Sequence, residues 1–342
     1  MFNSKIIGLG KYLPKKTITN DDLSNIMDTS DTWIKERTGI ETRRHIVKGD
    51  GDSTAVMAFK ASKIAIERAK IMPSDIELIL FATLSPDYYF PGSGVLLQNL
   101  LKIKNCPAMD IRNQCSGFIY ALSTADQFIK SGKYKNILVV GSENHSGGLD
   151  MTSRGRNVSV IFGDGAGAAV LSREIDLDRG LQSSSIYSDG QHALELSLKG
   201  PSTNRWVPEI LQENNPEDTS YYPFMNGQTV FKNAILRFSE VIQEALDKNK
   251  WSVNDLDLLI PHQANLRISQ FIQKKFKLNK DQVYNNIMRY GNTTAASIPI
   301  ALTEAWEEGK VKKDSKVILA AFGSGFTSVS YTHLTLPTTP YV

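Results

Sequence analysis

The chain has 342 residues, of which 41% are hydrophobic and 22% are charged, values typical of a globular protein with a large core. Its formal net charge of +3 is too small to indicate a nucleic-acid partner. Two cysteines are too few for a disulfide framework, and no apolar run is long enough to cross a bilayer. The N-terminus also lacks a signal-peptide pattern, so the sequence predicts a cytoplasmic protein that does not associate with membranes.

Helical patterns alternate with short apolar strands along the chain. Such alternation favours an α/β protein with a mostly parallel sheet in each half. The predicted pairs of helix and following strand are 54–70 with 78–81, 116–130 with 137–141, 230–249 with 258–260, and 294–308 with 317–321.

The second two pairs repeat the first two, which indicates a duplicated architecture. Asp75 and Asp255 hold the same place in their units, 180 residues apart (255 − 75). Cys115 and Asn292 begin corresponding helices at an offset of 177 (292 − 115). We therefore expect Cys115 and Asn292 to occupy the same structural position in the two halves.

Two segments interrupt this pattern. Residues 199–222 are polar and turn-forming, which suits either an ordered lid or entrance wall, or a disordered insertion. We divide the chain into halves at 1–175 and 176–330. Residues 331–342 contain no Lys, Arg, Asp or Glu, and we interpret them as a non-native or flexible tail.

Cys115 follows a predicted strand and begins a helix, where the macrodipole lowers a thiol pKa and favours the nucleophilic thiolate. An inert core cysteine is an equally open interpretation at this stage. His262 directly follows a buried strand, a place where α/β sheets gather functional side chains. Asn292 suits a helix N-cap, but with Cys115 and His262 it also suits a pocket that stabilises an oxyanion.

The remaining histidines lie in polar, loop-like sequence and carry little functional signal. They are His45, His145, His192 and His333.

Five motifs in order resemble the β-ketoacyl-acyl-carrier-protein synthase III family, within the thiolase superfamily, from residue 1 to about 330. They are TWIKERTGI at 32–40, the Cys115 turn, FGDGAGA at 162–168, PHQANLRI at 261–268 and GNTTAAS at 291–297. The resemblance implies a thiolase-like α/β fold of two pseudo-symmetric βαβαβαββ halves, stacked in five layers (αβαβα). The glycine-rich 162–168 stretch lacks the Lys-Ser/Thr of a phosphate loop and is structural in this family.

The resemblance also implies a reaction. Cys115 takes an acyl group from acyl-coenzyme A, and His262 and Asn292 bind malonyl-acyl-carrier protein and stabilise the enolate formed as carbon dioxide leaves. This is a decarboxylative Claisen condensation of fatty-acid biosynthesis, yielding β-ketoacyl-acyl-carrier protein. The backbone amides of Cys115 and Ser324 form a second oxyanion hole, where Ser324 replaces a more usual glycine and requires backbone angles that suit serine.

Further residues take binding roles by the same resemblance. Trp33 and Arg37, with Arg154 and Asn265, are expected to bind coenzyme A. Phe90 is expected to reach across a homodimer interface and close the partner's acyl pocket. Acidic acyl-carrier protein is expected to bind the basic side chains Arg267, Lys274 and Lys275, which a solvated helix face explains almost equally well. No metal or redox cofactor is implied.

The chain departs from the family at Arg112-Asn113-Gln114, where small apolar residues are usual, and in the longer 199–222 loop. We therefore expect a longer or unusual primer in place of acetyl. One alternative is a specialised acyl-condensing or acyl-transfer enzyme of secondary metabolism with the same fold. A second is a Cys-His-Asn thioester hydrolase. An inactive scaffold would be expected to lack one of the three polar residues, and all three are present.

Overall fold

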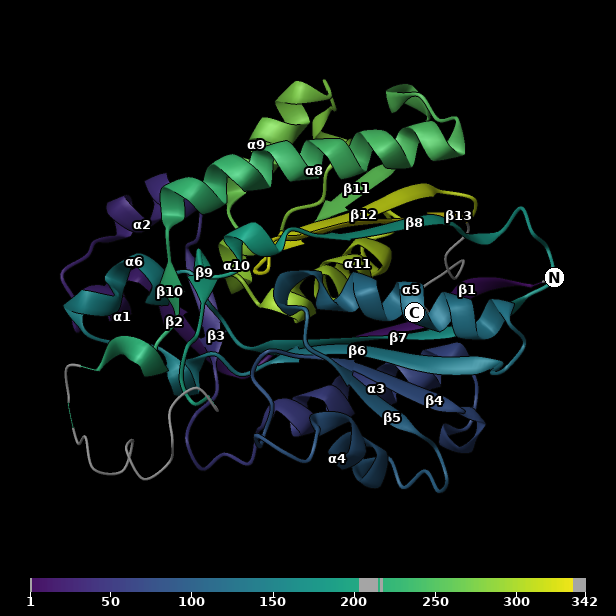
Figure 1. Cartoon of the computed structure of the whole chain (residues 1–342), viewed down its shortest axis with the longest axis horizontal. Coiled ribbons are helices and arrows are strands. Elements are labelled where there is room, and N and C mark those ends of the chain that lie inside the picture. The colour runs from purple at the N-terminus through teal and green to yellow at the C-terminus, as the bar shows by residue number, and fades with distance from the viewer. Residues whose placement is uncertain (1, 203–214, 216–217, 335–342) are drawn as a thin grey trace.

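Five alternating layers of helices and sheets build the molecule (Figure 1). The computed structural model describes residues 2–202, 215 and 218–334. Two sheets are separated by a central layer of helices, and each sheet carries further helices on its outer face. The expected layered α/β fold is therefore confirmed.

The first sheet belongs to the N-terminal half. Its strands, in spatial order, are β1 (Asn3–Tyr12), β7 (Gly165–Glu174), β6 (Asn136–Glu143), β4 (Leu78–Ala82) and β5 (Ala108–Ile111). β4 is parallel to both β5 and β6, whereas β7 is antiparallel to β1 and to β6. All five residues of β4 are buried, because helices cover both faces of the sheet.

The second sheet belongs to the C-terminal half. Its order is β11 (Leu258–Pro261), β12 (Lys316–Gly323), β13 (Thr327–Leu334) and β8 (Gly180–Ser188). Only β11 and β12 are parallel. In each sheet all strands but one run in the same direction, and the exceptions are β7 in the first sheet and β13 in the second. The prediction of mostly parallel sheets therefore holds for strand direction, although each sheet also contains two antiparallel pairs. β12 and β13, for example, are joined by a turn of three residues, and so short a connection permits only antiparallel pairing.

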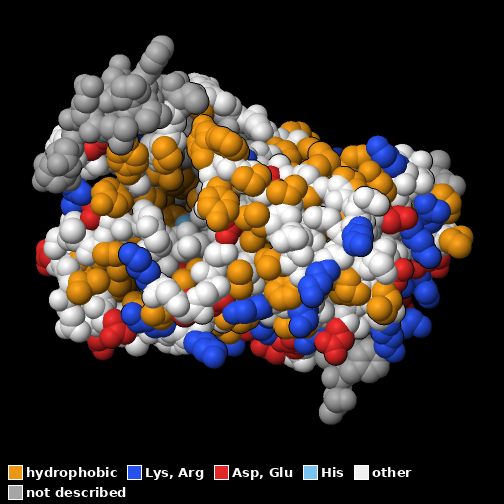
Figure 2. All heavy atoms as spheres, turned by 90° about the horizontal axis from the view of Figure 1, so that it is seen from below, with side chains coloured by type: hydrophobic (Ala, Val, Ile, Leu, Met, Phe, Trp, Pro, Cys, Tyr) orange, Lys and Arg blue, Asp and Glu red, His pale blue; other side chains and the backbone are white. Residues whose placement is uncertain are grey.

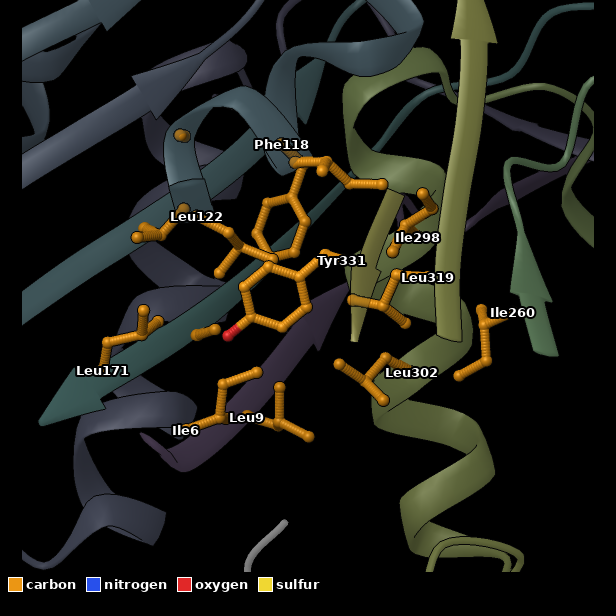
Figure 3. Packing of buried hydrophobic residues seen from close by; sticks show 14 of the residues in the cluster. Ile6, Leu9, Phe118, Leu122, Leu171, Ile260, Ile298, Leu302, Leu319 and Tyr331 are labelled. Atoms are coloured by element: carbon orange, nitrogen blue, oxygen red, sulfur yellow. The ribbon is translucent and has the colours of Figure 1, made fainter. Parts of the chain in front are cut away.

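The central layer consists of α5 (Gly117–Lys130) and α11 (Ser297–Glu307), which form the main core. Figure 3 shows Phe118 of α5 and Leu302 of α11 directed toward the same region as Tyr331 of β13. The outer face of the first sheet is covered by α3 (Thr54–Ala69) and α4 (Ser93–Leu100), and that of the second by α8 (Gly227–Asn249) and α9 (Leu266–Lys275).

Shorter elements gather at one end of the layers (Figure 1). They are the ribbon of β2 (Lys16–Thr19) and β3 (Thr42–His45), the ribbon of β9 (Leu196–Ser197) and β10 (Phe224–Met225), and the helices α1 (Asn20–Ser24), α2 (Asp31–Thr38), α6 (Arg156–Ser159) and α10 (Ile287–Tyr290).

The structural repeat differs from the predicted one by three residues. A 3₁₀ turn leads into α5 and another leads into α11, and each begins with a non-glycine residue at positive φ, Gln114 (φ 42°) and Thr294 (φ 49°). These turns are 180 residues apart (294 − 114), so the counterpart of Cys115 is Ala295 and the predicted equivalence with Asn292 is wrong. The offset of 177 relates the C-terminal ends of α5 and α11, because α11 has 11 residues and α5 has 14.

The predicted boundary at residue 330 falls inside β13 and needs correction. Tyr331 and His333 are buried, and their strand pairs with β12 on one side and β8 on the other. Residues 335–342 lie outside the described part of the chain. The junction after residue 175 lies between β7 and β8. Most of the 199–222 loop, at 203–214 and 216–217, also lies outside the described residues.

Within the described ranges, no helix combines the length and apolar character needed to span a membrane.

Candidate active site

Cys115 lies where the two halves meet. It occupies the 3₁₀ turn between β5 and α5, and the end of β12 packs against it from the other half. A Cβ on Gly323 would lie 2.6 Å from the Cβ of Cys115 and 3.2 Å from its backbone nitrogen. Glycine is therefore required at residue 323, because this approach lets the second sheet reach the cysteine.

Burial controls the acidity of this cysteine. The Cys115 side chain is 7% exposed, and desolvation, helped by the negative charge of Glu143, raises its thiol pKa to about 12. The expectation of a lowered pKa is therefore wrong for the unliganded protein, because desolvation outweighs the favourable groups. The backbone N–H groups of Cys115 and Ser324 act in the opposite direction and stabilise the thiolate.

His262 is buried directly after β11, as the strand-end argument predicted. Its Nδ1 lies 2.6 Å from Ser297 Oγ at the start of α11. Its Nε2 has no hydrogen-bond partner among the described residues. Burial lowers the His262 pKa to about 3, so the ring is neutral. A hydroxyl that donates to Nδ1 leaves the proton on Nε2, which becomes a donor for a substrate oxygen.

Asn292 is held by hydrogen bonds of both its backbone and its side chain. Its backbone N–H donates to Ile161 O (2.8 Å), and its Oδ1 accepts the Thr294 N–H (2.8 Å). The side-chain amide NH₂ is therefore the group left to donate. Asn292, His262 and Cys115 together line a cavity of about 100 Å³ whose other walls include α8 residues. The three side chains predicted from separate motifs thus converge.

A larger cavity of about 410 Å³ also reaches Cys115. Its walls come from the loop after β4, the turn before Cys115 and the β9 region, with Tyr88, Phe162 and Leu198 among the apolar lining. Figure 2 shows a hollow on the lower face of the molecule with hydrophobic side chains gathered around it. Cys115 therefore stands between two mainly apolar cavities, and the smaller one also carries His262, Asn265 and Asn292.

Sequence analysis missed two buried polar residues near Cys115. Glu143, the last residue of β6, accepts hydrogen bonds from the Leu84 and Ala295 amides, and burial raises its pKa to about 7. His145 lines the larger cavity and is 6% exposed, which corrects the interpretation of it as a loop histidine of little signal. Both lie at the carboxyl end of β6, and the strand-end argument used for His262 would have found them.

The glycine-rich 162–168 stretch is structural, as expected. Asp164 accepts hydrogen bonds from the backbone N–H groups of Ile46, His145 and Ser146. This carboxylate therefore joins the segment after β3 to the segment after β6, and it fixes one wall of the larger cavity.

Ser324 lies in the turn between β12 and β13. It is not among the described residues with positive φ, whereas Gly325 next to it has φ 106°. The condition that its backbone angles suit serine is therefore met. Its hydroxyl donates to Leu196 O, which ties this turn to the wall of the larger cavity.

Trp33, on α2, lies between two cations at the molecular surface. The guanidinium carbons of Arg37 and Arg156 are 4.7 Å and 5.3 Å from its ring centroid. Arg156 was not among the coenzyme A-binding residues predicted from the sequence. Arg154 lies near the same region, where its Nε donates to Asp150 (2.6 Å) and its guanidinium lies over Tyr222.

Asn265 joins the two halves. Its Nδ2 donates to Arg37 O (2.9 Å), and its Oδ1 accepts the Arg267 N–H at the start of α9. It also lines the smaller cavity with His262.

The remaining selected residues lie on the surface. Arg267, Lys274 and Lys275 are exposed along α9. Phe90 is 82% exposed, in the same loop as Tyr88 and Tyr89. Metal-ligand clusters of three or more His, Cys, Asp or Glu are absent from the described residues.

A buried cysteine, a neutral histidine and an asparagine, brought together by two stacked α/β halves, define a thiolase-fold condensing enzyme. Profiles described as 3-oxoacyl-[acyl-carrier-protein] synthase III and its C-terminal part match residues 109–190 and 246–333. The β-ketoacyl-[acyl-carrier-protein] synthase III of Aliivibrio fischeri is 43% identical over 324 residues, which are 95% of this chain and 97% of that protein. The chain therefore belongs to the β-ketoacyl-acyl-carrier-protein synthase III family.

Two solved structures agree with this assignment. The 3-oxoacyl-[acyl-carrier-protein] synthase III of Aquifex aeolicus has a TM-score of 0.87 at 42% identity, and the match covers 97% of this chain and 99% of that one. The priming β-ketosynthase from the R1128 polyketide biosynthetic pathway has a TM-score of 0.88 at 30% identity, with 99% and 97% covered.

Proposed function

We propose that this protein condenses an acyl group from acyl-coenzyme A with malonyl-acyl-carrier protein and releases β-ketoacyl-acyl-carrier protein. The observation that carries this proposal is the position of Cys115 between the two cavities. The larger cavity has room for an acyl chain, and the smaller one holds His262 and Asn292 beside the same sulfur.

In the first half-reaction, Cys115 Sγ attacks the thioester carbonyl. The carbon–sulfur bond to coenzyme A breaks, and coenzyme A leaves as the thiol with the proton that Cys115 loses. The oxyanion that forms is stabilised by the backbone N–H groups of Cys115 and Ser324, the same groups that favour the thiolate. Because burial raises the Cys115 pKa, the sulfur becomes a strong nucleophile once it is deprotonated.

In the second half-reaction, the malonyl thioester carbonyl binds between His262 Nε2 and the Asn292 amide. The bond to the carboxylate breaks, carbon dioxide leaves, and the electron pair forms an enolate that these two donors stabilise. The carbanion attacks the acyl-Cys115 carbonyl, the carbon–sulfur bond breaks, and Cys115 takes up a proton. A histidine whose pKa is about 3 remains a neutral donor throughout.

The surface residues support the remaining roles. Trp33 and Arg37 offer an aromatic face and a cation for the coenzyme A nucleotide, with Arg154 and Asn265 nearby. The exposed cations of α9 offer a docking face for an acidic carrier protein.

We further propose a cytoplasmic homodimer. Tyr88, Tyr89 and Phe90 form a run of exposed aromatic side chains, and such a patch suits a partner surface on which Phe90 would close the acyl pocket. The reaction as proposed needs no metal or redox cofactor, and coenzyme A takes part only as a thioester substrate.

The test separates the half-reactions. Intact-protein mass spectrometry after incubation with acyl-coenzyme A of short, medium and long chains should show a gain of one acyl group, and Cys115→Ala should abolish it. His262→Ala and Asn292→Ala should still be acylated but should lose carbon dioxide release from malonyl-acyl-carrier protein. Full-rate condensation by Asn292→Ala would contradict the role given to Asn292.

A second candidate is a priming synthase of secondary metabolism. The match to the R1128 priming β-ketosynthase and the large acyl cavity favour it. Comparing malonyl-carrier proteins of fatty-acid and polyketide type as acceptors distinguishes the two. The family assignment argues against the Cys-His-Asn hydrolase, which would release coenzyme A without forming a carbon–carbon bond.

A further inference from the structure

The larger cavity contains polar side chains that an all-carbon acyl chain does not need. His145 and Gln114 both line it, among mainly apolar neighbours such as Leu84 and Phe162. A plain hydrocarbon chain has no donor or acceptor to offer these two groups, whereas a chain that carries oxygen does.

His145 is held in place with one ring nitrogen unused. Its Nε2 lies 2.7 Å from Thr294 Oγ1, and its ring packs on Phe162 with centroids 4.6 Å apart. Its backbone N–H is bonded to Asp164. Nδ1 has no hydrogen-bond partner among the described residues, so it is the ring atom left for a ligand. Burial lowers the His145 pKa to about 4, so this nitrogen belongs to a neutral ring.

Gln114 directly precedes the nucleophile and has φ 42°, a conformation that a non-glycine residue rarely adopts. Its side-chain amide has no hydrogen-bond partner within the described part of the chain. The cavity therefore presents a second neutral group able both to donate and to accept, next to the sulfur that carries the acyl group.

The charged residues of this cavity do not favour a carboxylate ligand. Arg112 is exposed, so water screens its charge. Asp87, of opposite sign, also lines the cavity, and its carboxylate already accepts the Ala55 N–H and the Ser93 hydroxyl. Since the two charges oppose each other, the recognition available is hydrogen bonding by neutral groups.

We propose that the primer is an acyl chain that carries a neutral oxygen, a hydroxyl or an oxo group, which hydrogen-bonds to His145 Nδ1 and the Gln114 amide. This inference rests on the proposed function, since it names the substrate class of the same site. The cavity of about 410 Å³ is that of the single chain, and in the proposed homodimer the partner's Phe90 fills part of it, so the polar groups rather than the volume carry this inference.

The test compares acyl-coenzyme A substrates of equal chain length. Acylation of Cys115 is followed by intact mass with hexanoyl-coenzyme A, with hexanoyl chains that carry a hydroxyl or an oxo group at successive carbons, and with adipyl-coenzyme A. At least one oxygenated chain should exceed hexanoyl in kcat/KM for acylation by roughly fivefold or more, the worth of one or two neutral hydrogen bonds.

Variants assign the preference to the two side chains. His145→Leu and the volume-conserving Gln114→Met should each reduce the ratio of oxygenated to plain acylation rates roughly fivefold. A general structural defect would lower both rates together and leave the ratio unchanged. The exposed Gln127→Met on α5 serves as the matched control and should keep the wild-type ratio.

Each outcome is decisive. Equal or faster acylation by hexanoyl than by every oxygenated chain would overturn the inference and leave the condensing function in place. Fastest acylation by adipyl would overturn it in favour of a carboxylate ligand bound by Arg112. If no acyl-coenzyme A of any kind acylates the folded protein, the proposed function fails and the inference falls with it.

Discussion

Ser297 is the residue through which the structure orients His262. Its Oγ is 2.6 Å from His262 Nδ1, and both side chains are buried. Ser297→Ala removes the hydroxyl and leaves Nδ1 without a partner in a region closed to water. The ring is then free to place its proton on Nδ1, and Nε2 loses the proton that it is proposed to donate to the malonyl carbonyl.

The size of the effect follows from the burial. Leaving a buried acceptor unpaired costs about 1–3 kcal/mol. If that cost falls on the decarboxylation transition state, the rate falls roughly 5- to 150-fold. In the proposed mechanism His262 does not stabilise the oxyanion formed during acylation of Cys115. The acylation rate should therefore change little.

The assay measures acylation by intact mass and decarboxylation by carbon dioxide release from malonyl-acyl-carrier protein. Ser269→Ala is the matched control, because Ser269 is equally buried and its hydroxyl has no partner among the described residues. This control should retain both half-reactions. Wild-type decarboxylation by Ser297→Ala, or an equal loss of acylation and decarboxylation, would refute the positioning role.

Three further outcomes follow from the packing. Gly323→Ala should abolish acylation and lower Tm, because its Cβ would lie 2.6 Å from the Cβ of Cys115. Gly190→Ala is the control and should change neither, since no atom lies within 4 Å of its added Cβ. Wild-type acylation by Gly323→Ala would contradict this close approach of β12. Tyr331→Ala should lower the free energy of unfolding in urea by about 3–5 kcal/mol, since Tyr331 is 0% exposed. A change near zero would indicate that Tyr331 belongs to a tail outside the core. Folding raises the Glu143 pKa from about 4.5 to about 7, so the native state holds a proton that the unfolded chain releases, and stability should fall as pH rises across that window. Glu143→Gln should flatten this dependence of Tm on pH, and an unaltered slope would contradict the assignment.

The sequence located the elements well because their signals are local. The helix predicted at 54–70 is α3 (Thr54–Ala69), and the strand predicted at 78–81 is β4 (Leu78–Ala82). Apolar periodicity and turn residues determine such segments without reference to the rest of the chain. His262 was found for a similar reason, since its place after an apolar strand is visible in the sequence.

The errors came from properties that depend on distant parts of the chain. The pairing of β13 between β12 and β8 brings Tyr331 into the core, although its local composition resembles a tail. His145 is held by contacts that are distant in sequence, because its backbone N–H donates to Asp164 and its ring packs on Phe162. The Cys115 pKa depends on burial by both halves, which outweighs the local effect of the helix N-terminus.

The correspondence of Cys115 with Asn292 failed because α11 is three residues shorter than α5, so an offset taken at one end does not hold at the other. Asn292 reaches the site from the segment that precedes the turn, and its peptide group is bonded to Ile161 and Gly163 of the first half.

The central claim is that this site forms a carbon–carbon bond on an acyl group held by Cys115. The most direct measurement is the mass of malonyl-acyl-carrier protein after one turnover with the acylated enzyme. The account predicts that the carrier protein loses carbon dioxide and gains the whole acyl group, while Cys115 returns to its free mass. A carrier protein that loses carbon dioxide without gaining the acyl group, or an acyl group that is released to water, would contradict it.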